Sequence, residues 1–444
     1  MAITATAPTS NIGSIRNTTD VRAMSIATVL FFMWGLLTSL NDILIPHLKS
    51  IFELSYTQVM LVQFAFFSTY FIFALPSGKL VEWLGYKRAM IIGLLVMACG
   101  ALLFLPAASA ASYNLFLSAL IVLAAGITCL QVAANPYVTS LGPEKTAASR
   151  LNLSQAFNSL GTTLGPVFGG LLILGATQLP PEKLHQLSTA ALQAYRAAQA
   201  STVRGPYLGI AFTLIVLAVA LGLLKMPTLK SNLHTQDFRP GAFGSEATDS
   251  IWSHRWLLLA AVGIFLYVGA EVSIGSFLIN YFELPRIGGL TAQEGAKYVG
   301  YYWGGAMVGR LVGSGVLRYL RTGVVLAATA TIAGALVLIS MTNHGALAVW
   351  AILAVGLFNS VMFPNIFSLG LWNLGPLTSK GSSLMVMAIV GGAVLPELQG
   401  KLADHIGIQM AFFIPVLCYI YIAIFGFAAR NLMTSTVSFE AAPS

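Results

Sequence analysis

The chain is divided by short polar breaks into apolar stretches, each long enough to cross a membrane as one helix. The hydrocarbon core of a bilayer is about 30 Å thick, and a helix needs roughly 20 apolar residues to cross it. The stretches lie at about 24–45, 57–80, 88–106, 113–141, 149–175, 207–226, 256–282, 293–320, 323–341, 347–373, 380–403 and 409–430. This pattern predicts an all-α integral membrane protein with twelve transmembrane helices.

Charged residues are too few for a soluble protein. They make up 9% of the 444 residues, whereas an average soluble chain has about 25%. The net charge of +8 comes from Lys and Arg residues that stand singly in short loops, so no basic stripe is available for nucleic acid. No H-E-x-x-H or G-x-S-x-G motif is present, and we expect neither an enzyme nor a bound metal or cofactor. The expected surroundings are a lipid bilayer.

The basic residues also predict an orientation. With the N-terminus in the cytoplasm, fifteen Lys and Arg residues fall in cytoplasmic segments and seven in outer segments, while Arg310 lies within a span. Cytoplasmic loops carry the excess of Lys and Arg in membrane proteins. Both termini are therefore expected in the cytoplasm.

The sequence contains an internal repeat with an offset of about 230 residues. Matching residues are Gly161 and Gly391, Pro166 and Pro396, Gly170 and Gly400, and Pro136 and Pro364. Repeated halves are typical of transporters in which two bundles rock about a site near the middle of the membrane. The expected organisation is a tail at 1–23, six-helix bundles at 24–226 and 256–430, a linker at 227–255 and a tail at 431–444.

A glycine-rich run at 304–315 resembles a phosphate-binding loop only superficially. Arg310 and Leu311 stand where such a loop needs Lys followed by Ser or Thr, and no strand precedes the run. Gly305, Gly309 and Gly313 instead share one helix face, which predicts close packing against another helix.

Ionisable residues inside predicted spans are candidates for function, because a charge at the bilayer centre costs about 3 kcal/mol on insertion scales. Asp42 shares a helix face with Trp34 and Thr38, and it is either a proton carrier or a solvated residue at a helix end. Glu271 is a second candidate, with pairing to Arg310 as the structural alternative. We expect Arg310 to stabilise an inner gate or a helix terminus. For Glu397 we favour a structural role.

Neutral polar residues indicate the cargo. The fourth span carries Gln131 and Asn135 on one face, and the fifth carries Gln155 and Asn158. Side-chain amides both donate and accept hydrogen bonds, which suits a neutral polyhydroxylated ligand. An aromatic side chain such as Trp303 suits the apolar face of a sugar ring. Thr38 and Asn359 complete the predicted sugar-binding residues, although each amide could instead bond a neighbouring helix.

Several motifs resemble the fucose/glucose/galactose proton-symporter family of the major facilitator superfamily, over nearly the whole chain. They are residues 40–46 (LNDILIP), 78–88 (GKLVEWLGYKR), 131–138 (QVAANPYV) and 150–159 (RLNLSQAFNS). Residues 267–273 (YVGAEVS), 302–310 (YWGGAMVGR) and 358–360 (FNS) resemble the bacterial glucose/galactose transporters in particular. The resemblance implies two six-helix bundles in a bacterial inner membrane, and uptake of a neutral hexose with a proton by a monomer.

By the same resemblance, Asp42 is the proton site, and Gln155 and Asn158 contact the sugar. L-Fucose permeases carry an acidic residue at the position of Gln131. The Gln131 side chain of this chain cannot take up a proton. Glu271 therefore becomes the candidate for the role of a second acid. The residues leave open N-acetylglucosamine or L-fucose as cargo and Na⁺ as the coupled ion. A membrane sugar sensor or an integral-membrane enzyme is the alternative from a different class.

Overall fold

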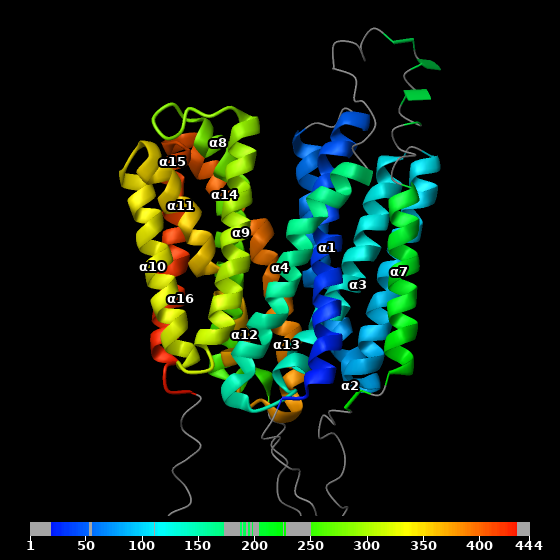
Figure 1. The fold of residues 1–444 in the computed structure, drawn as a ribbon, viewed down its shortest axis with the longest axis vertical. Coiled ribbons are helices and arrows are strands. Elements are labelled where there is room, and N and C mark those ends of the chain that lie inside the picture. The colour runs from blue at the N-terminus through cyan, green and yellow to red at the C-terminus, as the bar shows by residue number, and fades with distance from the viewer. Residues whose placement is uncertain are drawn as a thin grey trace, which may run out of the picture.

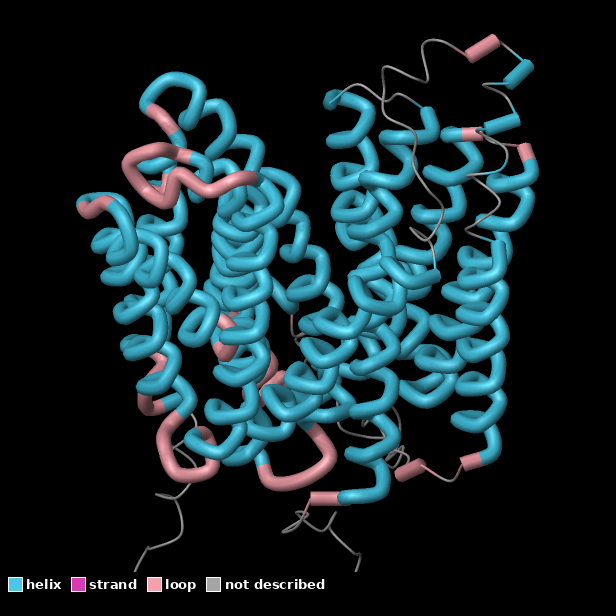
Figure 2. The backbone as a smooth tube through the Cα atoms, turned by 45° about the horizontal axis from the view of Figure 1, so that its top comes forward, coloured by secondary structure: helices cyan, strands magenta, loops and turns pink. Residues whose placement is uncertain are grey.

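The computed structural model describes residues 19–52, 56–110, 112–172, 204–224, 226–227 and 250–432, with a few single positions between 187 and 198. Side chains are described in these ranges except at 40–52, 56–61, 63, 166–172, 292 and 293. Every regular element in this part of the chain is a helix (Figure 1; Figure 2). The predicted tails and most of the predicted linker at 227–255 lie outside it, so these boundaries remain predictions.

The N-terminal half consists of long helices. They are α1 (Val21–Phe52), α2 (Tyr56–Ser109), α3 (Tyr113–Thr139), α4 (Ala147–Leu172) and α7 (Arg204–Leu223). The C-terminal half contains more interrupted helices. They are α8 (Arg255–Glu283), α9 (Ala292–Val316), α10 (Thr322–Thr342), α11 (Gly345–Asn359), α12 (Met362–Gly370), α13 (Thr378–Met387), α14 (Gly391–Ile406), α15 (Ile408–Ala411) and α16 (Phe413–Ala428). The predicted all-helical fold is confirmed.

The number of spans follows from the lengths of these helices. Nine described segments are long and apolar enough to cross a membrane, and one of them, Phe64–Ser109, is 46 residues long. It contains Gly85, whose φ of 80° and ψ of 167° break the helix at a conformation that favours glycine. This segment therefore supplies two spans, and the break lies between the predicted spans 57–80 and 88–106. The more polar helices α4 and α9 supply the remaining two of the twelve predicted spans.

Glycines bring neighbouring helices into backbone contact. A Cβ atom added to Gly309 of α9 would overlap the Leu357 carbonyl oxygen of α11, and one on Gly313 would overlap the Val361 side chain. Gly305 faces the same helix, and a Cβ atom added to it would lie 3.5 Å from the backbone nitrogen of Leu357. The packing face predicted from the glycine-rich run is thus present.

The two halves form separate groups of helices that approach each other at one end. In Figure 1 the N-terminal helices lie on the right, the C-terminal helices on the left, and the groups diverge upward. Contacts between halves involve α4 with α9 and α12, and α13 with α2 and α3. We call the end where α1 begins and α16 ends the closed end.

Candidate functional site

An ion pair lies between α8 and α9 in the C-terminal half. The Arg310 Nη2 atom lies 3.7 Å from Oε1 of Glu271, and the two side chains are 12% and 14% exposed. The Tyr267 hydroxyl donates a 2.7 Å hydrogen bond to the same carboxylate oxygen from one helical turn away. The pairing of Glu271 with Arg310, which the sequence left as an alternative, is therefore present.

Arg310 also joins the two halves. Its Nη1 atom donates to the Gln155 carbonyl oxygen on α4 at 3.4 Å and to the Ser159 hydroxyl. Its Nε atom donates to the Ser360 carbonyl oxygen, within its own half, at 3.2 Å. The role expected for Arg310, to stabilise an inner gate or a helix terminus rather than to touch substrate, stays a prediction.

The Ser360 carbonyl oxygen is available because of Pro364. Proline has no N–H group, so it leaves the carbonyl four residues earlier without its helical partner. In the matching position of the N-terminal half, Pro136 leaves the Val132 carbonyl oxygen free in the same way. The Ser382 hydroxyl of α13 donates to that oxygen at 2.9 Å, across the interface between the halves. The repeated prolines thus create acceptors on both sides of the interface.

Further hydrogen bonds cross between the halves at the closed end. The Ser149 hydroxyl donates to the Ser314 carbonyl oxygen at 2.6 Å, and the Ser379 hydroxyl donates to the Gly78 carbonyl oxygen at 2.9 Å. The Asn152 amide also donates to the Asn365 amide oxygen at 3.1 Å. We call the bonds donated by Ser149, Asn152, Ser379 and Ser382 the clasp. Their donors lie near the starts of α4 and α13, where the two halves touch.

The predicted amides of the fourth span lie inside the N-terminal half. Gln131 is 2% exposed and donates to the Tyr70 hydroxyl at 2.9 Å. Asn135 is fully buried, and neither of its amide atoms has a hydrogen-bond partner in the part of the chain that the structure describes.

The predicted residues of the first and fifth spans lie on α1 and α4, which pack directly against each other. The Asn158 amide donates to the Phe31 carbonyl oxygen at 3.0 Å, and the Gln155 side chain is 4% exposed. The Thr38 hydroxyl donates to the Trp34 carbonyl oxygen one turn earlier, at 3.0 Å. The side chain of Asp42 lies outside the described residues, although its backbone continues α1.

Two predicted sugar contacts lie in the C-terminal half and differ in accessibility. Asn359 is fully buried, and its amide donates to the Tyr302 hydroxyl at 2.8 Å and the Tyr419 hydroxyl at 3.2 Å. Trp303 is 38% exposed and lies against Gly275 of α8. Of these two, only Trp303 presents an accessible surface in this conformation.

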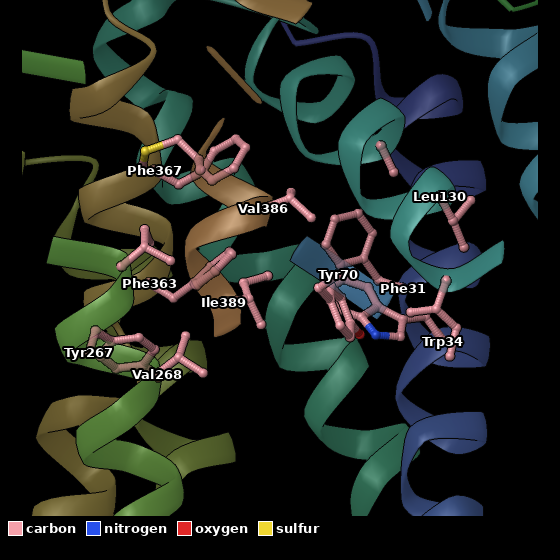
Figure 3. Close-up of a cluster of buried hydrophobic side chains, with 14 of the residues drawn as sticks. Phe31, Trp34, Tyr70, Leu130, Tyr267, Val268, Phe363, Phe367, Val386 and Ile389 are labelled. Atoms are coloured by element: carbon pink, nitrogen blue, oxygen red, sulfur yellow. The ribbon is translucent and has the colours of Figure 1, made fainter. Parts of the chain in front are cut away.

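Aromatic side chains of the N-terminal half face apolar side chains of the C-terminal half across the interface. Figure 3 shows Phe31, Trp34 and Tyr70 on one side, turned toward Val268 and Ile389 on the other. These three rings are at most 8% exposed, so in this conformation they belong to the buried hydrophobic core.

Glu397 does not belong to this site. Its side chain is 62% exposed and forms an exposed pair with Lys401, one turn later, at 3.5 Å. Such surface pairs contribute little, about 0–1 kcal/mol. Within the described residues, no group of three His, Cys, Asp or Glu side chains is placed to hold a metal ion.

Sequence reasoning missed several residues of the interface, including Tyr70, Ser159 and the serines of the clasp. The serines carry no distinguishing signal, because serine is common near helix ends. The acceptor at Val132 could have been found from Pro136 alone, since the freed carbonyl always lies four residues before a helical proline.

Together, the fold and the interface define a membrane protein of two repeated helical halves with polar and aromatic residues between them. Residues 26–388 match the Major Facilitator Superfamily. The chain belongs to this superfamily.

Relatives match over most of their length. The chain is 52% identical to the glucose/galactose transporter of Brucella abortus over 404 residues, which cover 91% of this chain and 93% of the relative. It is 40% identical to the L-fucose-proton symporter of Escherichia coli over 400 residues, with 89% and 90% covered. The crystal structure of the E. coli fucose:proton symporter FucP superposes with a TM-score of 0.84 at 37% identity, covering 93% of this chain and 99% of FucP.

Proposed function

We propose that this protein is a proton-coupled symporter that takes up a neutral hexose, glucose or galactose, by alternating access. It is a transporter and not an enzyme. The observation that carries the proposal is the 52% identity to a glucose/galactose transporter over 91% of this chain. The amides, hydroxyls and aromatic rings between the halves support it, because they suit a neutral sugar.

The proposed sugar-binding residues are Gln155, Asn158 and Trp303. Gln131, Asn135, Thr38 and Asn359 are further candidates. Gln131 and Asn359 are held by tyrosine hydroxyls, so in this conformation they stabilise the walls of the site. The proton site is Asp42, in the continuation of the helix that carries Trp34 and Thr38. No cofactor besides the transported proton is proposed.

We place the protein as a monomer in the bacterial inner membrane with both termini in the cytoplasm, following the distribution of Lys and Arg. The closed end, where α1 begins and α16 ends, is then cytoplasmic. The conformation described here is accordingly the one that receives sugar from outside.

The transport experiment uses purified protein in liposomes, with a panel of labelled hexoses and an imposed proton gradient. We expect accumulation of glucose or galactose that a protonophore abolishes and that needs no Na⁺. Asp42→Asn should abolish accumulation but retain exchange of sugar across the membrane. Accumulation by Asp42→Asn that still collapses with a protonophore would remove Asp42 from the mechanism.

L-Fucose is the second candidate cargo, favoured by the 40% identity to an L-fucose-proton symporter. The same panel decides between the sugars, because competition by unlabelled L-fucose measures its affinity directly. Alanine at Gln155 or Asn158 should raise the apparent KM for the preferred sugar. Unchanged transport in both variants would contradict the assignment of these two residues.

A further inference from the structure

Arg310 makes two kinds of contact that respond differently to motion of the halves. Its bonds to Glu271 and to the Ser360 carbonyl oxygen lie within the C-terminal half. Its bonds to the Gln155 carbonyl oxygen and the Ser159 hydroxyl cross to α4 in the other half. If the halves separate at the closed end, the first set persists and the second set must break.

The position of Arg310 makes the second set part of the closure. Arg310 lies one helical turn before Ser314, whose carbonyl oxygen accepts the clasp bond from Ser149. Gln155 lies between Asn152 of the clasp and Asn158, a proposed sugar contact. The guanidinium group therefore connects the halves directly above the clasp, next to the proposed sugar site.

Breaking these bonds is costly unless the guanidinium charge stays compensated. A charge that loses its partner within a membrane interior is strongly destabilised. Glu271 belongs to the same half as Arg310 and would move with it, and Tyr267 holds the carboxylate in place. The pair of Arg310 and Glu271 therefore carries no net charge, whether or not Arg310 is bonded to α4.

We propose that Arg310 is a positioning residue that latches the two halves, and that Glu271 is its permanent counter-ion rather than a carrier of the transported proton. This inference rests on the proposed symport function. It replaces the role in proton coupling predicted for Glu271 from the sequence and leaves Asp42 as the proton site. The latch opens when the halves separate, without exposing an unpaired charge to the membrane.

The test compares Glu271→Gln, Arg310→Gln and the double variant in sugar exchange without a proton gradient. Glu271→Gln should lower exchange at least about tenfold, because Arg310 keeps its bonds to α4. Separation of the halves would then leave the guanidinium charge without a partner. The double variant should recover at least about fivefold over Glu271→Gln, because no charge remains to strand. Glu397→Gln removes an exposed carboxylate from the same half and serves as the control with unchanged exchange.

A distance measurement tests the latch independently of transport. Spin labels at the exposed positions 144 and 380 report the separation of the halves at the closed end, in a background without the native cysteines. Glu271→Gln should keep the short distance, whereas the double variant should populate a longer one. A destabilised structure alone would not leave the distance short in Glu271→Gln and lengthen it in the double variant.

Three outcomes would overturn the inference. The first is that Glu271→Gln retains sugar exchange but loses accumulation, which is the behaviour of a proton carrier. The second is that the double variant exchanges sugar no faster than Glu271→Gln. The third is that the distance between the spin labels is the same in all variants. If the wild-type protein transports no hexose, the proposed function fails, but the distance measurement still decides whether Arg310 is a latch.

Discussion

Ser149 and Ser379 occupy equivalent positions in the two halves, and each donates a hydrogen bond to a backbone carbonyl of the opposite half. They are separated by the same offset as Gly161 and Gly391 in the internal repeat. Asn152 and Ser382 lie three residues later in each half and also donate to the opposite half, Asn152 to the Asn365 side-chain oxygen and Ser382 to the Val132 carbonyl oxygen. Equivalent residues of the two halves therefore hold the closed end together, with hydrogen bonds donated in both directions across the interface.

This symmetry predicts that Ser149→Ala and Ser379→Ala have similar effects. Each removes a hydrogen bond with a net value of about 1 kcal/mol, which corresponds to roughly a fivefold shift in the ratio of open to closed states. Spin labels at 144 and 380 should show this shift in each variant and a larger one in the double variant. Ser368→Ala is the matched control, because the buried Ser368 hydroxyl bonds within its own helix. Equal distance distributions in the double variant and wild type would contradict the role of the clasp.

A second prediction concerns the packing of α9. Gly309→Ala should destabilise the protein, because the added methyl group would overlap the Leu357 carbonyl oxygen. Overpacking of this kind costs about 1–3 kcal/mol. Gly304→Ala in the same helix meets no atom within 4 Å and is the control. Thermal unfolding of the detergent-purified variants, followed by size-exclusion chromatography, should show a lower Tm only for Gly309→Ala.

A third prediction concerns the amide of Asn359. It donates to both Tyr302 and Tyr419, so either Tyr→Phe variant leaves it one acceptor. The amide has two N–H groups, so each single variant leaves one buried donor unsatisfied, which costs about 1–3 kcal/mol. Each single variant should therefore lower Tm, and the double variant should lower it further. Tyr319→Phe, at an 88% exposed position, should have no effect. A single variant that keeps the wild-type Tm would show that the removed hydroxyl is not an acceptor on which Asn359 depends.

A fourth prediction concerns sugar recognition by Trp303. Trp303→Ala should raise the apparent KM for hexose about tenfold, a loss of about 1.4 kcal/mol of binding free energy. Trp303→Phe keeps an aromatic face and should have a smaller effect. Trp350 is 55% exposed and packs on Tyr298 and Tyr301 rather than on Gly275, so Trp350→Ala is the control. If both alanine variants transport with the wild-type KM, Trp303 does not contact the sugar.

The sequence predicted the positions of the helices more fully than it predicted the contacts between them. Hydropathy and breaker residues located the spans, and glycine spacing identified the packing face of α9, because both signals lie within one segment. For Glu271 the sequence left two alternatives, a role in proton coupling or an ion pair with Arg310. A buried charge needs a compensating partner, but the sequence does not say which residue that partner is.

The contacts between halves were beyond sequence reasoning. The helical period gives the face on which Gln131 lies, but the identity of the facing residue depends on the rotation and height of two helices. Gln131 was expected near sugar, and its first partner proved to be Tyr70 on another helix of the same half. The four donors of the clasp are small polar residues whose importance follows only from the acceptors opposite them.

Those acceptors have a consequence for how such a gate can change through mutation. Three of the four are backbone carbonyl oxygens, at Gly78, Val132 and Ser314, and every residue type carries the same carbonyl group. Substitution of the Val132 or Ser314 side chain leaves the acceptor in place, whereas a Cβ atom on Gly78 would overlap the Ser383 side chain of α13. The bonds to Val132 and Ser314 therefore depend on the donor serines and, at Val132, on Pro136. A lineage could change the ease of opening by replacing a donor serine, without a compensating replacement of the accepting side chain.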